Sequence, residues 1–339
     1  MAGGALNRLP LMDEPIRPFS TVTVFGGMTL DRIALSEFPP VMGASNPGTV
    51  RRLPGGVGFN VATVLTRLGF PTRMVSAVGD DSDADAILAT AHEIGIGTDG
   101  VAIVHGASTA GYHATFDDAG NLIIGIADMK ICELITPVTV SSAAASAAPD
   151  DLWVIDANLP QATIEFLAAE AAAARRPLAA LTVSPAKAVR LASILDAITV
   201  LFTNRKEAAA LLDYDPDDPK LASPALALEL TGARSTAVVV TSGSEPLAAA
   251  RHGEVRSYAP LRAEVTGVNG AGDSLAAGTI LGLSDGIGLG DAVRFGMAAA
   301  AMALEAGGIL AAPFSRDALA ERLTAGPRGQ LRRAAAAAS

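Results

Sequence analysis

The chain has 339 residues, of which half are hydrophobic, 18% charged and 4% aromatic, so it is long enough for a large core and is not a disordered chain. The formal net charge is −10 (25 Lys and Arg against 35 Asp and Glu), which disfavours nucleic-acid binding as a primary role. A single cysteine, Cys132, excludes an internal disulfide, and no apolar run reaches the roughly 18 residues of a membrane span, so we expect a cytoplasmic protein.

The first part of the chain alternates glycine turns with short apolar segments. Residues 1–20 are expected to be a flexible leader. The elements predicted next are a buried strand at 21–27, a glycine turn and amphipathic helix at 54–70, a strand at 72–81 and a helix at 84–96. A β-like pattern with a hairpin signal runs from Gly100 to Ile126. Together with a Pro- and Gly-rich excursion, it predicts a small β-sheet lid from about residues 29–52 and 106–127.

After Thr136, apolar strands alternate regularly with helices. The predicted strands are 152–158, 178–184, 197–204 and 235–243, and the predicted helices are 160–174, 186–195, 205–213, 224–231, 274–283, 290–306 and 315–324. This alternation indicates an α/β fold with a central, mostly parallel sheet flanked by helices. Ligands of such sheets bind at the carboxyl ends of the strands, where Asn158, Asn204 and Thr241 fall. We place one domain at 21–324, followed by a low-complexity tail at 325–339.

The segment VTGVNGAGDSLAAG (265–278) carries the most distinctive pattern. Gly270, Ala271 and Gly272 let several backbone N–H groups approach one point, and a helix starting behind them adds partial positive charge, so the turn suits a phosphate. The charge of Asp273 opposes a phosphate. Its carboxylate fits, however, if it takes the proton of a hydroxyl while the N–H groups hold a transferring phosphoryl group. A C-cap turn followed by an ordinary helix is the alternative.

Three further segments place polar residues beside glycine turns or strand ends. Asp31 follows the first strand and can accept hydrogen bonds from sugar hydroxyls, or it is a solvated turn residue. Gly55-Gly56 and Asn60 bring backbone and an amide close to a ligand, or they form the first turn of a helix. Asn204 and Glu207 can order water around Mg²⁺ near nucleotide phosphates, or they form a helix capping box.

Three common motifs are absent. The chain has no GxxxxGK[ST] sequence, which disfavours a P-loop kinase, and GGVGFN lacks the spacing of a dinucleotide-binding GxGxxG turn. GxSxG is also missing, so an α/β-hydrolase has little support.

The motifs, in this order, resemble those of the PfkB/ribokinase family of carbohydrate kinases over about residues 21–320. NGAGDSLAAG is similar to the second signature of that family and PGGVGFNVATVLTRLG to the first. The resemblance implies a ribokinase-like fold, phosphoryl transfer from ATP with Mg²⁺, and a homodimer that forms through the β lid. The roles it implies are Asp273 as base; Gly270, Ala271 and Gly272 as anion hole; Asp31, Gly55, Gly56, Asn60 and Asn158 as sugar contacts; Asn204, Thr241 and Gly243 as nucleotide contacts; and Glu207 as a Mg²⁺-associated residue acting through water.

Within the family, three longer stretches look most like pseudouridine kinases: IADMKICELITP (126–137), VIDANLP (154–160) and TVSPAKAVRL (182–191). That resemblance implies phosphorylation of the 5′-hydroxyl of a ribosyl nucleoside. It also places Lys187 near the phosphates or the substrate, with a surface helix lysine as the alternative. Another sugar or nucleoside kinase of the family, or a non-catalytic binding protein of the same fold, stays open as an alternative.

The chain departs from the family pattern at three places. Gly267-Val268-Asn269 stands where relatives often carry Asp-Thr-Thr, which removes side-chain oxygens and puts potassium dependence in doubt. Pro246 replaces a glycine of the nucleotide loop and cannot donate an N–H. Thr182 stands where many relatives carry an acidic residue.

Overall fold

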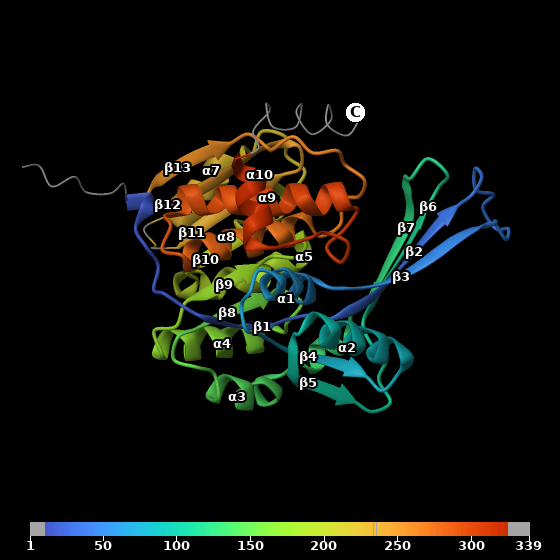
Figure 1. Ribbon diagram of the computed structural model, residues 1–339, viewed down its shortest axis with the longest axis horizontal. Coiled ribbons are helices and arrows are strands. Elements are labelled where there is room, and N and C mark those ends of the chain that lie inside the picture. Colours follow the sequence, from blue (N-terminus) through green and yellow to red (C-terminus); the bar gives the residue numbers. More distant parts are fainter. Residues whose placement is uncertain (1–10, 233, 235, 325–339) are drawn as a thin grey trace, which may run out of the picture.

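The computed structural model describes residues 11–232, 234 and 236–324 (Figure 1). The predictions for residues 1–10 and for the tail at 325–339 lie outside these residues. A large α/β body carries a small sheet that extends from it as an arm. This architecture confirms the predicted α/β fold with a second, smaller sheet. None of the described helices is both long and apolar enough to cross a membrane.

The large sheet has nine strands in the order β13-β12-β11-β10-β9-β8-β1-β4-β5. They are β1 (Thr21–Phe25), β4 (Thr72–Gly79), β5 (Gly97–Val104), β8 (Asp151–Asp156), β9 (Leu178–Leu181), β10 (Val200–Asn204), β11 (Ala237–Ser242), β12 (Glu245–Arg251) and β13 (Glu254–Tyr258). Neighbours from β5 to β11 pair in parallel, whereas β11, β12 and β13 pair antiparallel at one edge. The carboxyl ends of seven strands therefore meet along one edge of the body.

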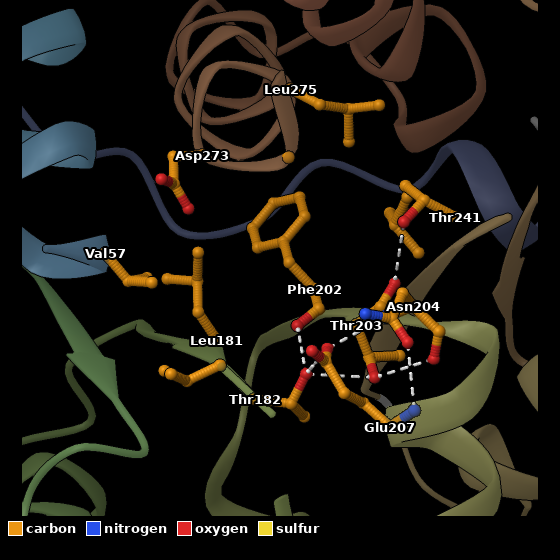
Figure 2. Close-up of a pocket in the computed structure, with 13 residues that line it drawn as sticks. Val57, Leu181, Thr182, Phe202, Thr203, Asn204, Glu207, Thr241, Asp273 and Leu275 are labelled. Atoms are coloured by element: carbon orange, nitrogen blue, oxygen red, sulfur yellow. Dashed lines mark hydrogen bonds between the residues drawn. The ribbon is translucent and has the colours of Figure 1, made fainter. Parts of the chain in front are cut away.

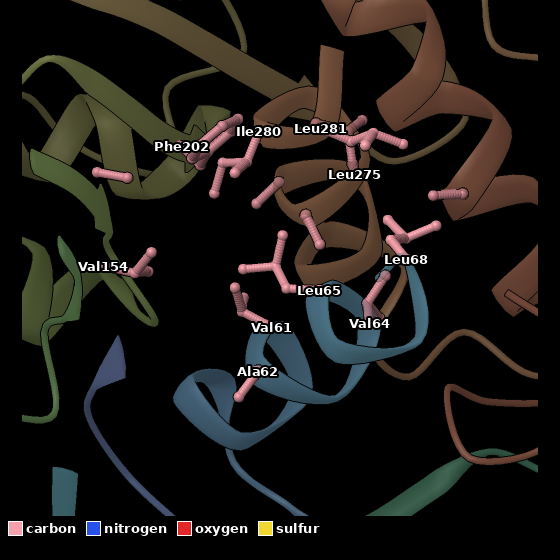
Figure 3. Close-up of a cluster of buried hydrophobic side chains, with 14 of the residues drawn as sticks. Val61, Ala62, Val64, Leu65, Leu68, Val154, Phe202, Leu275, Ile280 and Leu281 are labelled. Carbon is pink, nitrogen blue, oxygen red and sulfur yellow. The ribbon is translucent and has the colours of Figure 1, made fainter. Parts of the chain in front are cut away.

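Helices cover both faces of this sheet and enclose two apolar cores. One face carries α1 (Val57–Arg67), α2 (Ser82–Ile94), α8 (Ala271–Ser284), α9 (Leu289–Ala306) and α10 (Arg316–Thr324). The other carries η2 (Lys130–Leu134), α3 (Pro137–Ala145), α4 (Gln161–Ala173), α5 (Pro185–Ala188), η3 (Val189–Ala197), α6 (Arg205–Leu211) and α7 (Ser223–Thr231). Side chains of α1 and α8 such as Val61, Leu65 and Leu281 gather in one buried cluster (Figure 3). This contact fixes the two glycine turns that precede these helices relative to each other.

The small sheet has the strand order β3-β2-β6-β7. Its strands are β2 (Thr29–Ser36), β3 (Gly48–Gly55), β6 (Gly111–Phe116) and β7 (Leu122–Asp128). Arg32 of β2 and Arg52 of β3 both pair with Asp83 in the first turn of α2, at 2.6 and 2.5 Å. These ion pairs tie the base of the small sheet to the body, so that Asp31 and Gly55 lie near the carboxyl end of β1.

Some elements differ from the predictions. The prediction of a flexible leader is wrong for residues 11–20, because Met12, Ile16 and Phe19 are buried in the main core. The β-like pattern that starts at Gly100 is also divided differently, since β5 pairs in parallel with β4 in the large sheet. Helix α3 and the β12–β13 hairpin were not predicted, because short alanine-rich segments show neither a helical nor a strand period.

Candidate active site

The turn before α8 forms the centre of the site. Gly270 has φ 78°, a left-handed conformation that favours glycine, and a Cβ at this position would lie 2.4 Å from Cδ1 of Ile309. Helix α8 begins at Ala271, so the first N–H groups of the helix have no intrahelical acceptor and point out of its N-terminus. With the helix dipole, they form a site that attracts an anion.

Asp273 lies in the first turn of α8, next to these N–H groups. Its Oδ2 accepts a hydrogen bond of 2.7 Å from the Asn60 side-chain amide of α1. Burial raises the pKa of Asp273 to about 7, the Asn60 bond opposes this rise, and the negative charges of Asp156 and Glu207 add to it. A carboxylate with a pKa near neutrality is well suited to accept a proton as a general base.

On one side of Asp273 lies a pocket of about 140 Å³ (Figure 2). Asn204 and Glu207 face this pocket from the junction of β10 and α6. The Asn204 side chain accepts from the N–H of Glu207 at 3.0 Å, and the Glu207 carboxylate accepts from the N–H of Asn204 at 3.2 Å. The capping box is therefore present, and both residues also line the pocket. The complete lining is Val57, Leu181, Thr182, Val183, Phe202, Thr203, Asn204, Glu207, Val239, Thr241, Gly272, Asp273 and Leu275.

A second, more apolar pocket of about 190 Å³ adjoins the first. The two share Thr241, Gly272 and Leu275. Its wall combines Gly243 of the β11–β12 turn with side chains of α9, including Met297. A flat apolar group such as a nucleobase suits such a wall, with its phosphates directed toward the turn before α8.

On the other side of the turn lies a cavity of about 440 Å³, which we call the acceptor cavity. Asp31 and Gly55 of the small sheet, Asn60 of α1 and Gly270 line it together. The Thr29 hydroxyl donates to Oδ1 of Asp31 at 2.8 Å, and burial raises the pKa of the Asp31 carboxyl. The rest of the wall comes from the small sheet, the segment before α8, the last residue of α9 and the loop after it: Ile33, Arg51, Leu53, Pro54, Thr266, Asn269, Ala306, Gly307, Gly308, Ile309, Leu310 and Ala311.

Gly56 is the residue before the first turn of α1 and does not line the acceptor cavity. It has φ 96°, and a Cβ there would lie 2.6 Å from the carbonyl oxygen of Gly27. This close approach of two backbones brings the start of α1 against the end of β1. Asn158 and Lys187 lie beside each other, with a bond of 2.6 Å from Lys187 Nζ to Asn158 Oδ1, but neither lines the three cavities described above.

Asp156 at the end of β8 is a site residue that the sequence analysis missed. Its carboxylate is fully buried and accepts three backbone hydrogen bonds of 2.8 to 2.9 Å, from the N–H groups of Gly27, Gly58 and Asn158. Burial raises its pKa, although these bonds oppose the rise. Asp156 thus joins the turns after β1, before α1 and after β8. In the sequence, Asp156 stands within the quoted stretch VIDANLP (154–160), but no role was predicted for it.

Arg67 in the last turn of α1 was also missed. Its guanidinium donates to the carbonyl oxygens of Ile309, Leu310 and Ala312, at 2.7, 3.0 and 3.2 Å. Ile309 in turn packs against Gly270. Arg67 therefore holds the loop that lies behind the turn before α8, and this loop forms part of the acceptor cavity.

The described residues contain no cluster of three or more His, Cys, Asp or Glu that could hold a metal ion. Asp273 and Glu207 nevertheless place two carboxyl groups on one pocket. This arrangement fits Mg²⁺ bound mainly by nucleotide phosphates and water, because Mg²⁺ usually keeps several waters and takes few protein ligands.

Comparison with known proteins adds independent information. The model of the pfkB carbohydrate kinase family matches residues 20–313. A curated relative, the pseudouridine kinase of Escherichia coli strain K12, is 28% identical over 283 residues, which cover 84% of this chain and 90% of the relative. The structure of a carbohydrate kinase from Agrobacterium tumefaciens is 33% identical and covers 91% of this chain and 98% of its own, with a TM-score of 0.76. The ribokinase structure from Thermotoga maritima, at 20% identity, covers 90% of this chain and 100% of its own with a TM-score of 0.76, and supports the fold alone.

Proposed function

This chain belongs to the pfkB family of carbohydrate kinases, which use ATP, and on that premise we propose that it phosphorylates the 5′-hydroxyl of pseudouridine. The observation that carries the proposal is the position of Asp273. It lines the pocket that contains Asn204 and Glu207, and it is hydrogen-bonded to Asn60, which lines the acceptor cavity. A carboxylate between two cavities suits a reaction that joins a phosphate donor to a hydroxyl acceptor.

In this mechanism, Asp31 and Asn60 orient the acceptor hydroxyls and Asp273 accepts the proton of the 5′-hydroxyl. The oxygen then forms a bond to the γ-phosphorus as the bond from that phosphorus to the β-phosphate oxygen breaks, leaving ADP. The N–H groups of the turn from Gly270 to Gly272 stabilise the charge on the transferring group. Glu207 would hold the water shell of Mg²⁺, and the ion, when bound, would neutralise charge at the phosphates.

An assay of ADP release with a panel of acceptors tests the proposal. The panel contains pseudouridine, uridine, adenosine and ribose, each with ATP and Mg²⁺. We expect release with pseudouridine to exceed release with every other acceptor. Higher turnover with another acceptor selects the second candidate, a different sugar or nucleoside kinase, which is favoured by the generic hydroxyl-binding chemistry of Asp31 and Asn60. No release with any acceptor supports a non-catalytic binding protein.

We also propose that two copies of the chain pair through the small sheet. Large apolar side chains are exposed on it, including Val50, Ile124 and Ile126, each more than half exposed. Such an exposed apolar surface favours association with a partner. Sedimentation of the native chain tests this, and we expect a dimer that dissociates when Ile124 and Ile126 are both changed to Lys. A monomeric native chain at micromolar concentration would contradict the pairing.

A further inference from the structure

Thr182 follows β9 directly and lies at the bottom of the pocket that contains Asp273 and Glu207 (Figure 2). It is 1% exposed, and its N–H donates to the carbonyl of Phe202 in the neighbouring strand at 3.3 Å. The residue is therefore almost fully buried and lies where the pocket meets the sheet.

The Thr182 hydroxyl donates to Oε2 of Glu207. It also lies 3.0 Å from the Thr203 hydroxyl. A hydroxyl has a single hydrogen, and a bond to a carboxylate is about twice as strong as a bond to a neutral acceptor. The hydrogen of Thr182 therefore goes to Glu207, while the Thr203 hydroxyl donates to the carbonyl oxygen of Asn204 at 3.2 Å.

The two oxygens of Glu207 then have different tasks. Oε2 accepts from the Thr182 hydroxyl and from the N–H of Asn204. Oε1 has no hydrogen-bond partner among the residues that the structure describes. Because Glu207 lines the pocket, Oε1 is the oxygen that remains for a ligand or its water.

The backbone after Thr182 is strained. Val183 has φ 70°, and the N–H of Ser184 donates to the carbonyl of Thr182 at 2.8 Å, so the three residues form a γ-turn. A β-branched residue rarely adopts this conformation, and such strain is concentrated at functional sites. The turn directs the chain sharply away after Thr182 and leaves its side chain against Glu207.

We propose that Thr182 is a positioning residue for Mg²⁺-nucleotide binding: its hydroxyl occupies Oε2 of Glu207 and thereby presents Oε1 to the water around the ion. This inference rests on the proposed kinase function. The hydrogen bond from Thr182, which follows β9, to Glu207 of α6 would then be part of the nucleotide site.

The test measures ADP binding by calorimetry, once with Mg²⁺ and once with EDTA, so that the readout does not depend on turnover. We expect Thr182→Val to weaken binding about tenfold with Mg²⁺, because loss of an outer partner typically costs 10- to 100-fold in metal affinity. Binding in EDTA should change less than about twofold, and Thr182→Ser, which keeps the hydroxyl, should bind like the native chain. Thr231→Val is the matched control, since the buried Thr231 hydroxyl donates to Ala227 within its own helix.

A double-mutant cycle with Glu207→Gln tests the route of the effect. If Thr182 acts through Glu207, adding Thr182→Val to Glu207→Gln causes no further loss of Mg²⁺-dependent binding. Equal losses with Mg²⁺ and with EDTA, or fully additive losses in the cycle, would overturn the inference while ADP binding and kinase function stand. If the native chain binds no ADP under either condition, the proposed function fails first and the inference fails with it.

Discussion

The two sides of Asp273 are built from different parts of the molecule. On the nucleotide side, the wall comes from the ends of β9, β10 and β11, and its polar side chains, such as Asn204 and Glu207, are bonded to one another. On the acceptor side, Asp31 and Gly55 come from the small sheet, and the loop at 306–311 closes the wall. If the proposed function holds, we expect residues of the core sheet to affect phosphoryl transfer and residues of the small sheet to affect which hydroxyl is bound.

Replacing the residue between the two sides should have the largest effect. Asp273→Asn keeps the size of the side chain but removes the proton acceptor, so we expect kcat to fall by about 10²- to 10⁴-fold. ADP and acceptor should bind with nearly native affinities in calorimetry, because asparagine has nearly the same shape and the other wall residues are unchanged. Near-native kcat would exclude Asp273 as the base.

A change on the acceptor side alone should separate the two halves. Asp31→Asn removes a charged hydrogen-bond partner worth about 1.5–3 kcal/mol, so the KM for the acceptor should rise roughly 10- to 100-fold while the KM for ATP stays the same. Asp117→Asn, in the exposed β6–β7 turn of the same sheet, is the control for a lost carboxylate charge. An equal rise in both KM values would contradict the division of the site.

A smaller effect is expected from the loop after α9, which lines the acceptor cavity and packs against Gly270. Arg67→Met removes three hydrogen bonds to the carbonyls of Ile309, Leu310 and Ala312, and the loop then supports Gly270 less firmly. We expect kcat to fall about tenfold, since a displacement near 1 Å can cost up to about 10²-fold.

Arg17 offers a matched control for Arg67. It also donates to three carbonyls, those of Pro149, Ala174 and Arg175, but at the opposite end of the strands. Arg17→Met and Arg67→Met each lose three hydrogen bonds to backbone carbonyls, so both variants should be less stable to denaturant. The value of kcat should fall in Arg67→Met alone. If kcat follows stability equally in the two variants, Arg67 has only a structural role.

Two features beside Asp273 could be predicted from the sequence because their contacts are local, whereas their role in nucleotide binding stays a prediction. Asn204 and Glu207 are three residues apart, and the turn from Gly270 to Asp273 is continuous, so turn and cap chemistry identify them. The large parallel sheet was likewise visible from continuous apolar strands. None of these predictions required knowledge of tertiary packing.

The acceptor side depends on contacts between distant segments. Asn60 and Asp273 are 213 residues apart, and Arg67 and Ile309 are 242 residues apart. Arg67 reads as an ordinary basic residue in the last turn of a helix, a position that the helix dipole alone favours. Asp156 is similarly inconspicuous, because nothing near it in sequence indicates that it accepts N–H groups from two other turns.

The smallest effect should come from Asn60, whose amide tunes Asp273. The base must be unprotonated, so kcat of the native chain should rise with pH and reach half its maximum near pH 7. The Asn60 hydrogen bond favours the charged form, so Asn60→Ala should move that midpoint to higher pH. At saturating acceptor, the two enzymes should differ most below pH 7 and least well above it.

The pH dependence of stability reports the pKa of Asp273 independently of catalysis. In the unfolded chain Asp273 loses its proton near pH 3.9, but in the folded chain burial keeps the proton until about pH 7. Between these values the folded state binds more protons, so the contribution of Asp273 to the free energy of unfolding is full below about pH 4 and is lost as pH rises through 7. Asp273→Asn should remove this loss. The free energy of unfolding of the variant, compared with that of the native chain, should therefore be higher above pH 7 than below pH 4. If the difference in stability between the two proteins does not change over that interval, Asp273 is ionised throughout, and the kinetic midpoint belongs to another group.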